Sequence, residues 1–78
     1  MSDIRYEVTK KMAVLSANER TGWTKEVNMI SWNGKPAKLD IRDWAPDHSK
    51  MSKGVTLTRE EAGALFGALQ RMTREDFG

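Results

Sequence analysis

The hydrophobic residues of this chain change their spacing once, and that change limits the folds open to it. Up to Leu57 they alternate with polar residues or fall in short runs, as in strands. After Thr58 they recur every three or four positions, as on one side of a helix. Several strands followed by one helix predict an α+β fold, with an antiparallel sheet in the order β-β-β-β-α.

Turn-forming residues separate the expected strands. The four strand segments cover residues 4–16, 23–32, 37–44 and 55–58. The first contains two apolar runs on either side of Lys10 and Lys11. The sequence NGKP at residues 33–36 indicates a tight turn. A long polar loop follows at residues 45–54. The chain of 78 residues is long enough for one domain, residues 1–78.

The C-terminal helix shows both a start signal and an apolar side. Thr58 and Glu61 have the spacing of a capping box, so Thr58 is expected to be the N-cap. Gly63 and Gly67, four positions apart, leave a smooth strip where a second helix could approach. The apolar side consists of Ala62, Leu65, Phe66, Leu69 and Met72. Because so small a domain buries a thin core, we expect a homodimer. The candidate contacts are Leu65, Leu69 and Met72.

The third strand is expected to have two different faces. Leu39 and Ile41 point to one face, which suits packing against the helix. The opposite face carries Lys38, Asp40, Arg42 and Trp44. Aromatic rings can stack on unpaired bases while cations neutralise phosphates. We therefore expect Arg42 and Trp44 to lie outside the core and to bind single-stranded nucleic acid.

Other aromatic and basic residues extend this candidate surface. Trp32 lies at a strand end beside the NGKP turn, and Trp23 shares a face with Lys25. Lys50 and Lys53 place positive charge on the polar loop. The distribution of charge is consistent with nucleic-acid binding, because residues 1–58 carry ten Lys and Arg against seven Asp and Glu. Which of the three tryptophans belong to the core stays open at this point.

The sequence gives little support to an enzyme, a metal site or a membrane protein. It has no cysteine, and His48 has no second histidine to complete a zinc site. Asp40, Asp43 and Asp47 are expected to be strand and turn residues. No apolar run approaches the ~20 residues that span a bilayer. We expect a non-enzymatic protein without cofactor, metal or small-molecule substrate, in the cytoplasm and compatible with association with the nucleoid.

Several motifs resemble the DNA-binding core of the transcriptional positive cofactor four (p15) coactivators, and more closely their small bacterial YdbC-type relatives. The matching positions are Asp40-Ile41-Arg42, Trp44, Pro46-Asp47, Met51, Lys53-Gly54, Val55-Thr56-Leu57 and Glu60-Glu61. The upstream sequences VLSAN, GWTKEVN and SWN extend the resemblance toward the bacterial type. The loop at residues 47–52 is shorter than in the eukaryotic coactivators.

The resemblance implies a homodimer of curved β-β-β-β-α protomers that holds single-stranded DNA in grooves formed by the sheets. It implies DNA contacts from Trp32, Arg42, Trp44 and Lys53, with Lys35 and Lys38 added by the basic turn. It does not imply transcriptional coactivation.

Two other functions use the same surface. The protein could bind RNA or act as a transcriptional regulator, because nothing in the sequence distinguishes ribose from deoxyribose. It could also be a protein–protein adaptor with an exposed tryptophan face. Steep weakening of binding with salt would distinguish nucleic-acid binding from the adaptor function.

Overall fold

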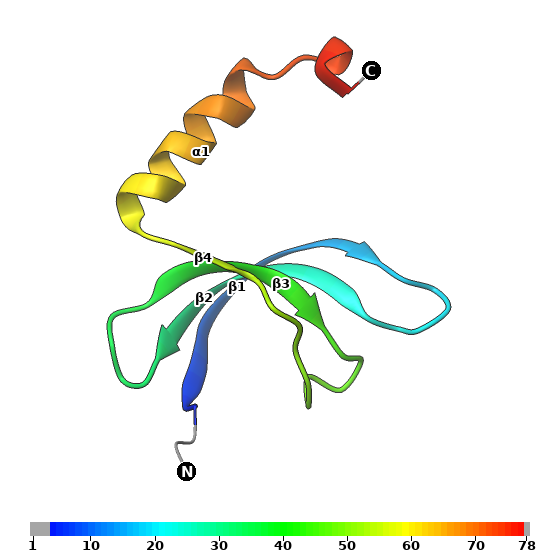
Figure 1. The fold of residues 1–78 in the computed structure, drawn as a ribbon, viewed down its shortest axis with the longest axis vertical. Coiled ribbons are helices and arrows are strands. Elements are labelled where there is room, and N and C mark those ends of the chain that lie inside the picture. The colour runs from blue at the N-terminus through cyan, green and yellow to red at the C-terminus, as the bar shows by residue number, and fades with distance from the viewer. Residues whose placement is uncertain (1–3, 78) are drawn as a thin grey trace.

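A computed structural model describes residues 4–77 and confirms the predicted order of elements (Figure 1). The elements are β1 (Tyr6–Ala17), β2 (Thr24–Trp32), β3 (Lys38–Trp44), β4 (Val55–Leu57), α1 (Arg59–Arg71) and the short 3₁₀ helix η1 (Arg74–Phe77). The four strands form one antiparallel sheet in the order β1-β2-β3-β4. The sequence pattern did not predict η1.

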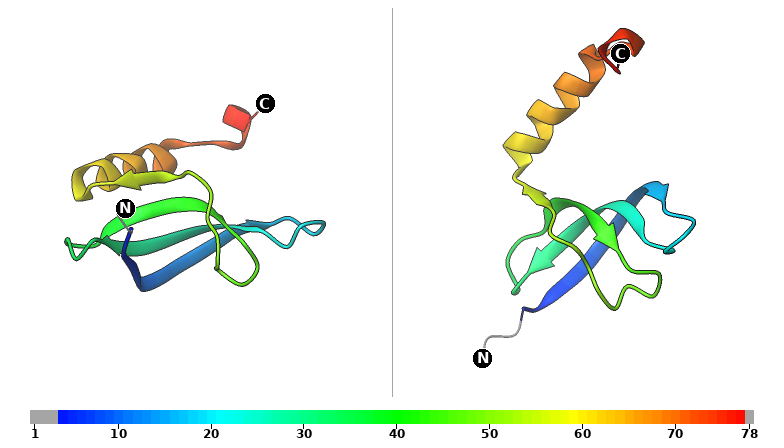
Figure 2. Two further views of the ribbon diagram at one scale, coloured as in Figure 1. Left: turned by 60° about the horizontal axis from the view of Figure 1, so that its bottom comes forward. Right: turned by 45° about the vertical axis from the view of Figure 1, so that its right-hand side comes forward.

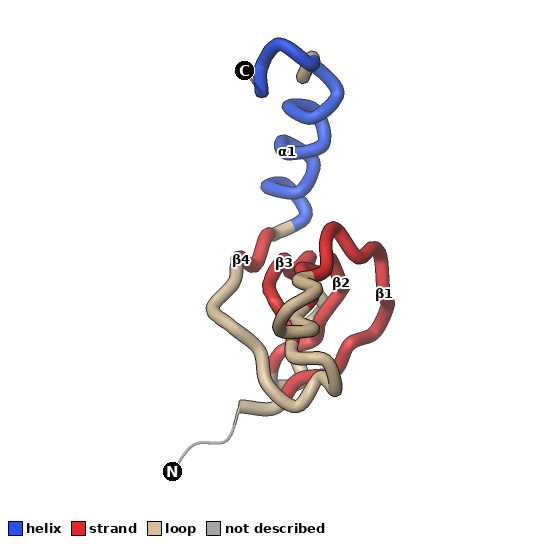
Figure 3. Tube along the Cα trace, turned by 90° about the vertical axis from the view of Figure 1, so that its right-hand side faces the viewer, coloured by secondary structure: helices blue, strands red, loops and turns tan. Residues whose placement is uncertain are grey.

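β1 is longer than its partner, and this difference curves the sheet. β1 has 12 residues and β2 has nine. Their pairing shifts register between Val8 and Lys10, between Lys11 and Ala13, and again before Ser16. Such irregularities bend a strand and increase its twist. The two apolar runs of the sequence are therefore one bent strand, and the sheet curls, as Figures 2 and 3 show.

The turn between β2 and β3 is the tight turn that NGKP predicts. Asn33 and Gly34 both have positive φ, 52° and 75°. The backbone N–H of Lys35 donates to the carbonyl of Trp32 at 2.9 Å. Two central residues with positive φ define a type I′ turn, whose twist matches that of the paired strands. Strand pairing resumes at Ile30 and Lys38, one residue out of step with the pair Trp32 and Lys35 that closes the turn.

The register gives the sheet two distinct faces. Glu26 pairs with Arg42 and Asn28 with Asp40, so these side chains share one side, here called the aromatic–polar face. Its other members include Tyr6, Thr24, Ile30, Trp32, Lys38, Trp44 and Thr56. The opposite side, the aliphatic face, carries Val27, Met29, Leu39, Ile41, Val55 and Leu57.

The core lies on the aromatic–polar face. The buried hydrophobic residues of the described chain are Ile30, Trp44 and Ala45, and the buried polar residues are Glu26, Asn28 and Asp40. The loop of residues 45–54 folds against this face, where His48 bonds to Glu26. The aliphatic face is less covered, and Val55 on it is exposed.

Helix α1 begins as predicted but does not cover the aliphatic face. Thr58 is the N-cap, and the capping box with Glu61 is complete. Because Thr58 alone separates β4 from α1, the chain has no loop that could turn the helix back over the sheet. The helix therefore projects away from the sheet (Figure 1), and none of its residues is buried.

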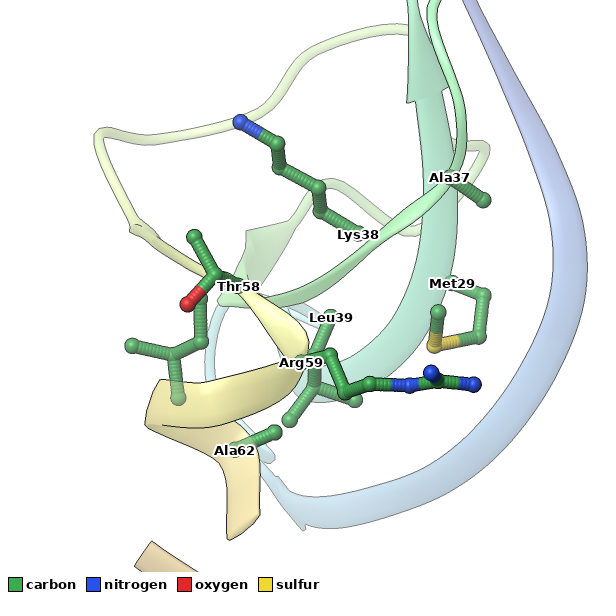
Figure 4. A pocket seen from close by; sticks show the side chains of 8 residues that line it. Met29, Ala37, Lys38, Leu39, Thr58, Arg59 and Ala62 are labelled. Atoms are coloured by element: carbon green, nitrogen blue, oxygen red, sulfur yellow. The ribbon is translucent and has the colours of Figure 1, made fainter. Parts of the chain in front are cut away.

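The start of α1 does meet the aliphatic face. Met29 and Leu39 of the sheet line one hollow of about 330 Å³ together with Arg59 and Ala62, which belong to the first turns of the helix (Figure 4). The expectation that the helix packs on this face is thus right only for its first turns. Within residues 4–77, no helix is long and apolar enough to cross a bilayer.

Candidate nucleic-acid interface

Four aromatic side chains from separate parts of the chain meet on the aromatic–polar face. The ring of Tyr6 lies 5.7 Å from Trp32 and 5.6 Å from Trp44, tilted to both. The ring of His48 stacks on Trp44 at 4.3 Å with an interplanar angle of 9°. The register of β1 and β2, which pairs Tyr6 with Trp32, and the folding of the 45–54 loop create this cluster.

Trp44 lies on the predicted face, but the expectation that it is outside the core is wrong. Its side chain is 0% exposed. Tyr6 approaches it from β1, and His48 covers it from the loop. A tight loop brings His48 back, because the N–H of Ala45 donates to the carbonyl of Lys50 at 3.0 Å. Stacking on a base would require His48 to move.

Arg42 also lies on the predicted face, but it is turned inward rather than toward solvent. Its Nε and Nη2 atoms donate to the two carboxylate oxygens of Asp40 at 2.6 and 2.7 Å. Its Nη1 donates to the carbonyl of Ser52 at 3.2 Å and lies 3.4 Å from the sulfur of Met51. Its side chain is 12% exposed. The guanidinium therefore already has partners and is not free to meet a phosphate in this structure.

Arg42 joins three parts of the site. Its guanidinium carbon lies 4.8 Å from the centroid of the Trp32 ring, within the range of a cation–π contact. Its bond to Ser52 ties β3 to the polar loop. Gly54 permits this close approach, because a Cβ there would lie 2.5 Å from the carbonyl oxygen of Ile41 and against Arg42. This explains the glycine of the Lys53-Gly54 motif.

Glu26 is the second buried carboxylate of this face. Its oxygens accept hydrogen bonds from Thr24 at 2.6 Å, from Asn28 at 3.2 Å and from the Nε2 of His48 at 3.1 Å. Burial raises the pKa of Glu26, but these hydrogen bonds and the charge of His48 outweigh burial and hold the pKa below its usual value. Glu26 is therefore a stable negative charge beside Trp44.

Two polar groups of the cluster have no protein partner. The indole Nε1 atoms of Trp32 and Trp44 are buried and have no hydrogen-bond acceptor within residues 4–77. Buried donors are usually paired. An acceptor from outside the described chain would reach these two N–H groups only after the side chains that cover them moved.

The predicted lysines lie outside the cluster, and the register places Lys25 on the aliphatic face, opposite the cluster. All five are exposed: Lys25, Lys35, Lys38, Lys50 and Lys53. Lys25 and Lys53 line the same hollow of about 240 Å³, which also includes Arg42 and Asp43. Figure 4 shows the side chain of Lys38 extending away from the start of α1. Lys35 belongs to the turn after β2, and Lys50 belongs to the 45–54 loop.

Trp23 is not a member of the aromatic cluster. It precedes β2 and is half-buried. Its backbone N–H donates to the hydroxyl of Thr21, and its carbonyl accepts from Asn18. The structure thus brings Trp32, Arg42 and Trp44 together but leaves Trp23 apart from them.

Sequence reasoning missed two members of the cluster. Tyr6 falls in the first expected strand, residues 4–16, without a role of its own, and the lone His48 indicates neither a zinc site nor a serine nucleophile. The spacing of Tyr6 and Trp32 around their hairpin would have paired them only if the three register shifts of β1 were known. No local signal places His48 on Trp44. Among the described residues there is also no group of His, Asp and Glu able to hold a metal ion.

Comparisons with known proteins confirm the family resemblance that the motifs indicate. Residues 20–68 match the family described as Transcriptional Coactivator p15 (PC4). An uncharacterised protein of Treponema pallidum is 51% identical over 75 residues, which cover 96% of this chain and 87% of the relative. The chain therefore belongs to the transcriptional coactivator p15 (PC4) family, a non-enzymatic family of nucleic-acid-binding proteins.

Proposed function

We propose that the protein binds single-stranded DNA with little sequence preference. The observation that supports this most directly is the cluster of Tyr6, Trp32, Trp44 and Arg42 on a sheet face that α1 leaves open. The family is generally associated with single-stranded DNA binding. Aromatic side chains stack on any base, which gives affinity without sequence preference.

The charges favour one orientation of the strand. Glu26 is a buried carboxylate at the centre of the face and would repel phosphates, whereas the charge of Asp40 is paired with Arg42. The exposed lysines lie outside this centre. We therefore propose that bases point inward, toward Tyr6 and Trp32, while phosphates follow the lysines. The proposed phosphate contacts are Lys25, Lys35, Lys38, Lys50 and Lys53.

The tryptophans and Arg42 have different parts in this proposal. Trp32 is half-buried and Tyr6 is 38% exposed, so both present ring surface to a base. Trp23 would stack on a base farther along the strand. Arg42 acts by holding Trp32 and the 45–54 loop in place, and Trp44 receives a base only when His48 leaves it.

The binding proposal predicts a steep salt dependence. Titration of labelled oligo-dT, oligo-U and a duplex of matching sequence should show that oligo-dT binds more tightly than the duplex, because stacking needs unpaired bases. With about four phosphates neutralised, a fourfold rise in salt should weaken binding roughly 50-fold. Replacing Lys53 with glutamine should weaken binding and reduce the salt slope by about 0.7.

Arg74→Gln is the matched control, because it removes one positive charge from η1, outside the proposed site. It should leave the affinity and the slope unchanged. Binding that hardly responds to salt would reject phosphate recognition and favour the adaptor function. Preference for the duplex would reject stacking, and preference for oligo-U would favour the RNA-binding function.

We also propose that the active form is a homodimer. The described protomer buries few hydrophobic side chains, and those of α1 are largely uncovered. Phe66 is 62% exposed, Leu69 50% and Met72 41%. Leu65 lies on the same side and is half-buried. A second copy would cover this strip, and the small core of the protomer makes such burial necessary for stability.

A charge on the apolar strip should therefore break the dimer. Sedimentation equilibrium at micromolar concentration should show a dimer for the natural protein and a monomer for Leu69→Glu. Ala64→Glu introduces the same charge on the opposite, exposed side of α1 and should remain dimeric. A natural protein that sediments as a monomer at tens of micromolar would contradict this proposal.

A further inference from the structure

His48 is the part of the 45–54 loop that lies on the aromatic cluster. Its ring is parallel to Trp44, with 9° between the planes and 4.3 Å between the centroids. Trp44 is 0% exposed, whereas the side chain of His48 is 34% exposed. His48 therefore lies between one face of the indole and solvent. A flat heteroaromatic ring in this position has the shape and the stacking geometry of a nucleobase.

A specific hydrogen-bond network holds His48 in this position. Its Nε2–H donates to both carboxylate oxygens of Glu26 at 3.1 Å. Thr24 and Asn28 bond to the same carboxylate and fix its orientation. The backbone of His48 has φ of 61°, a conformation that is unfavourable for a residue with a side chain. The contacts of the ring therefore compensate for the cost of this backbone conformation. A ligand that replaced those contacts would allow the backbone of His48 to relax.

Besides the ring of His48, two backbone bonds close the loop, from Ala45 to Lys50 and from His48 to Ala45. Asp47, Ser49 and Lys50 are exposed, and Asp47 bonds only to Ser49 among the side chains of the described chain. The stronger attachments, from Ser52 to Asp43 and from Arg42 to Ser52, lie toward β4. Movement of His48 thus requires a change in residues 46–50, without loss of the strand pairing.

We propose that His48 is a built-in competitor for the base-stacking face of Trp44, and that an unpaired nucleobase of the bound strand displaces it. This inference rests on the proposed function. When His48 leaves, one face of Trp44 opens beside Tyr6 and Trp32, and the three rings form a continuous stacking surface. The closed loop lowers the apparent affinity in proportion to the fraction of protein that is open.

His48→Ala and His48→Phe test the proposal as a matched pair, with labelled oligo-dT as the probe. Both variants remove the bond to Glu26 and keep a side chain at positive φ, but only alanine uncovers Trp44. His48→Ala should bind oligo-dT roughly 3–10-fold more tightly than the natural protein, if about a tenth to a third of the natural protein is open. His48→Phe keeps a ring over Trp44 and should gain clearly less affinity than His48→Ala. Weaker binding by His48→Ala would show that His48 contacts the DNA, and unchanged binding would show no competition; either result overturns the proposal.

A second measurement reads DNA binding on the natural protein, and variants serve only to assign its signals. In ¹⁵N-labelled protein, the indole N–H signal of Trp44, assigned with Trp→Phe variants, and the ring signals of His48 should both shift on saturation with oligo-dT. Binding that leaves both signals unmoved would overturn this inference while leaving the proposed function intact. Failure of the natural protein to bind oligo-dT at all would reject both.

Discussion

Replacing Trp44 with alanine is expected to lower the free energy of unfolding by about 3–5 kcal/mol, the usual cost of removing a large buried aromatic side chain. Trp44 is the largest fully buried side chain of the described residues. It contacts Tyr6 from β1 and His48 from the loop, so its loss would leave a cavity where three segments meet. Urea unfolding at one fixed protein concentration measures this change, since dimerisation would otherwise alter the apparent stability.

Trp23→Ala is the matched control for this measurement. It removes the same side chain from a half-buried position outside the aromatic cluster. Its cost should be clearly smaller than that of Trp44→Ala. Equal stability of the Trp44→Ala variant and the natural protein would contradict the burial of Trp44 and restore the expectation that it is a free stacking residue.

The arrangement of the elements was largely predictable from the sequence, because it depends on local patterns. Alternation, the Asn33-Gly34 turn and the Thr58–Glu61 capping box each act within a few residues, and the structure confirms all three. The two faces of β3 were predictable for the same reason. The direction of α1 was not, because the apolar side of a helix does not reveal which surface will cover it.

The environment of the site residues depended on contacts between distant segments. Alternation placed Arg42 and Trp44 on the correct face, but it could not show that the face is buried. The burial of Trp44 comes from His48 and Tyr6, which are distant along the chain or in a loop without a regular pattern. A polar face with aromatic residues can be a solvated surface or a polar core. Only the contacts made by segments distant in the sequence distinguish the two.

Arg42 gives the second large expected effect. Arg42→Ala should lower the free energy of unfolding by about 3–5 kcal/mol, because removing one partner of a buried ion pair leaves the other charge without compensation. Asp40 is 0% exposed, and besides Arg42 its carboxylate accepts a hydrogen bond from Thr56 at 3.2 Å. The variant would also release Ser52 and the 45–54 loop. The first expectation for Arg42, a phosphate contact outside the core, would instead leave stability unchanged.

A double-mutant cycle of Asp40 and Arg42 measures how strongly the two charges depend on each other. Asp40→Ala leaves the guanidinium of Arg42 at the edge of the cluster, where it is 12% exposed and can turn toward water. It should therefore cost less than Arg42→Ala. The double variant Asp40→Ala/Arg42→Ala should cost much less than the two single changes together, because no buried charge is left unpaired. Urea unfolding of the four proteins measures the coupling. Additive costs, or an Arg42→Ala protein as stable as the natural one, would show that the pair does not hold the loop to the sheet.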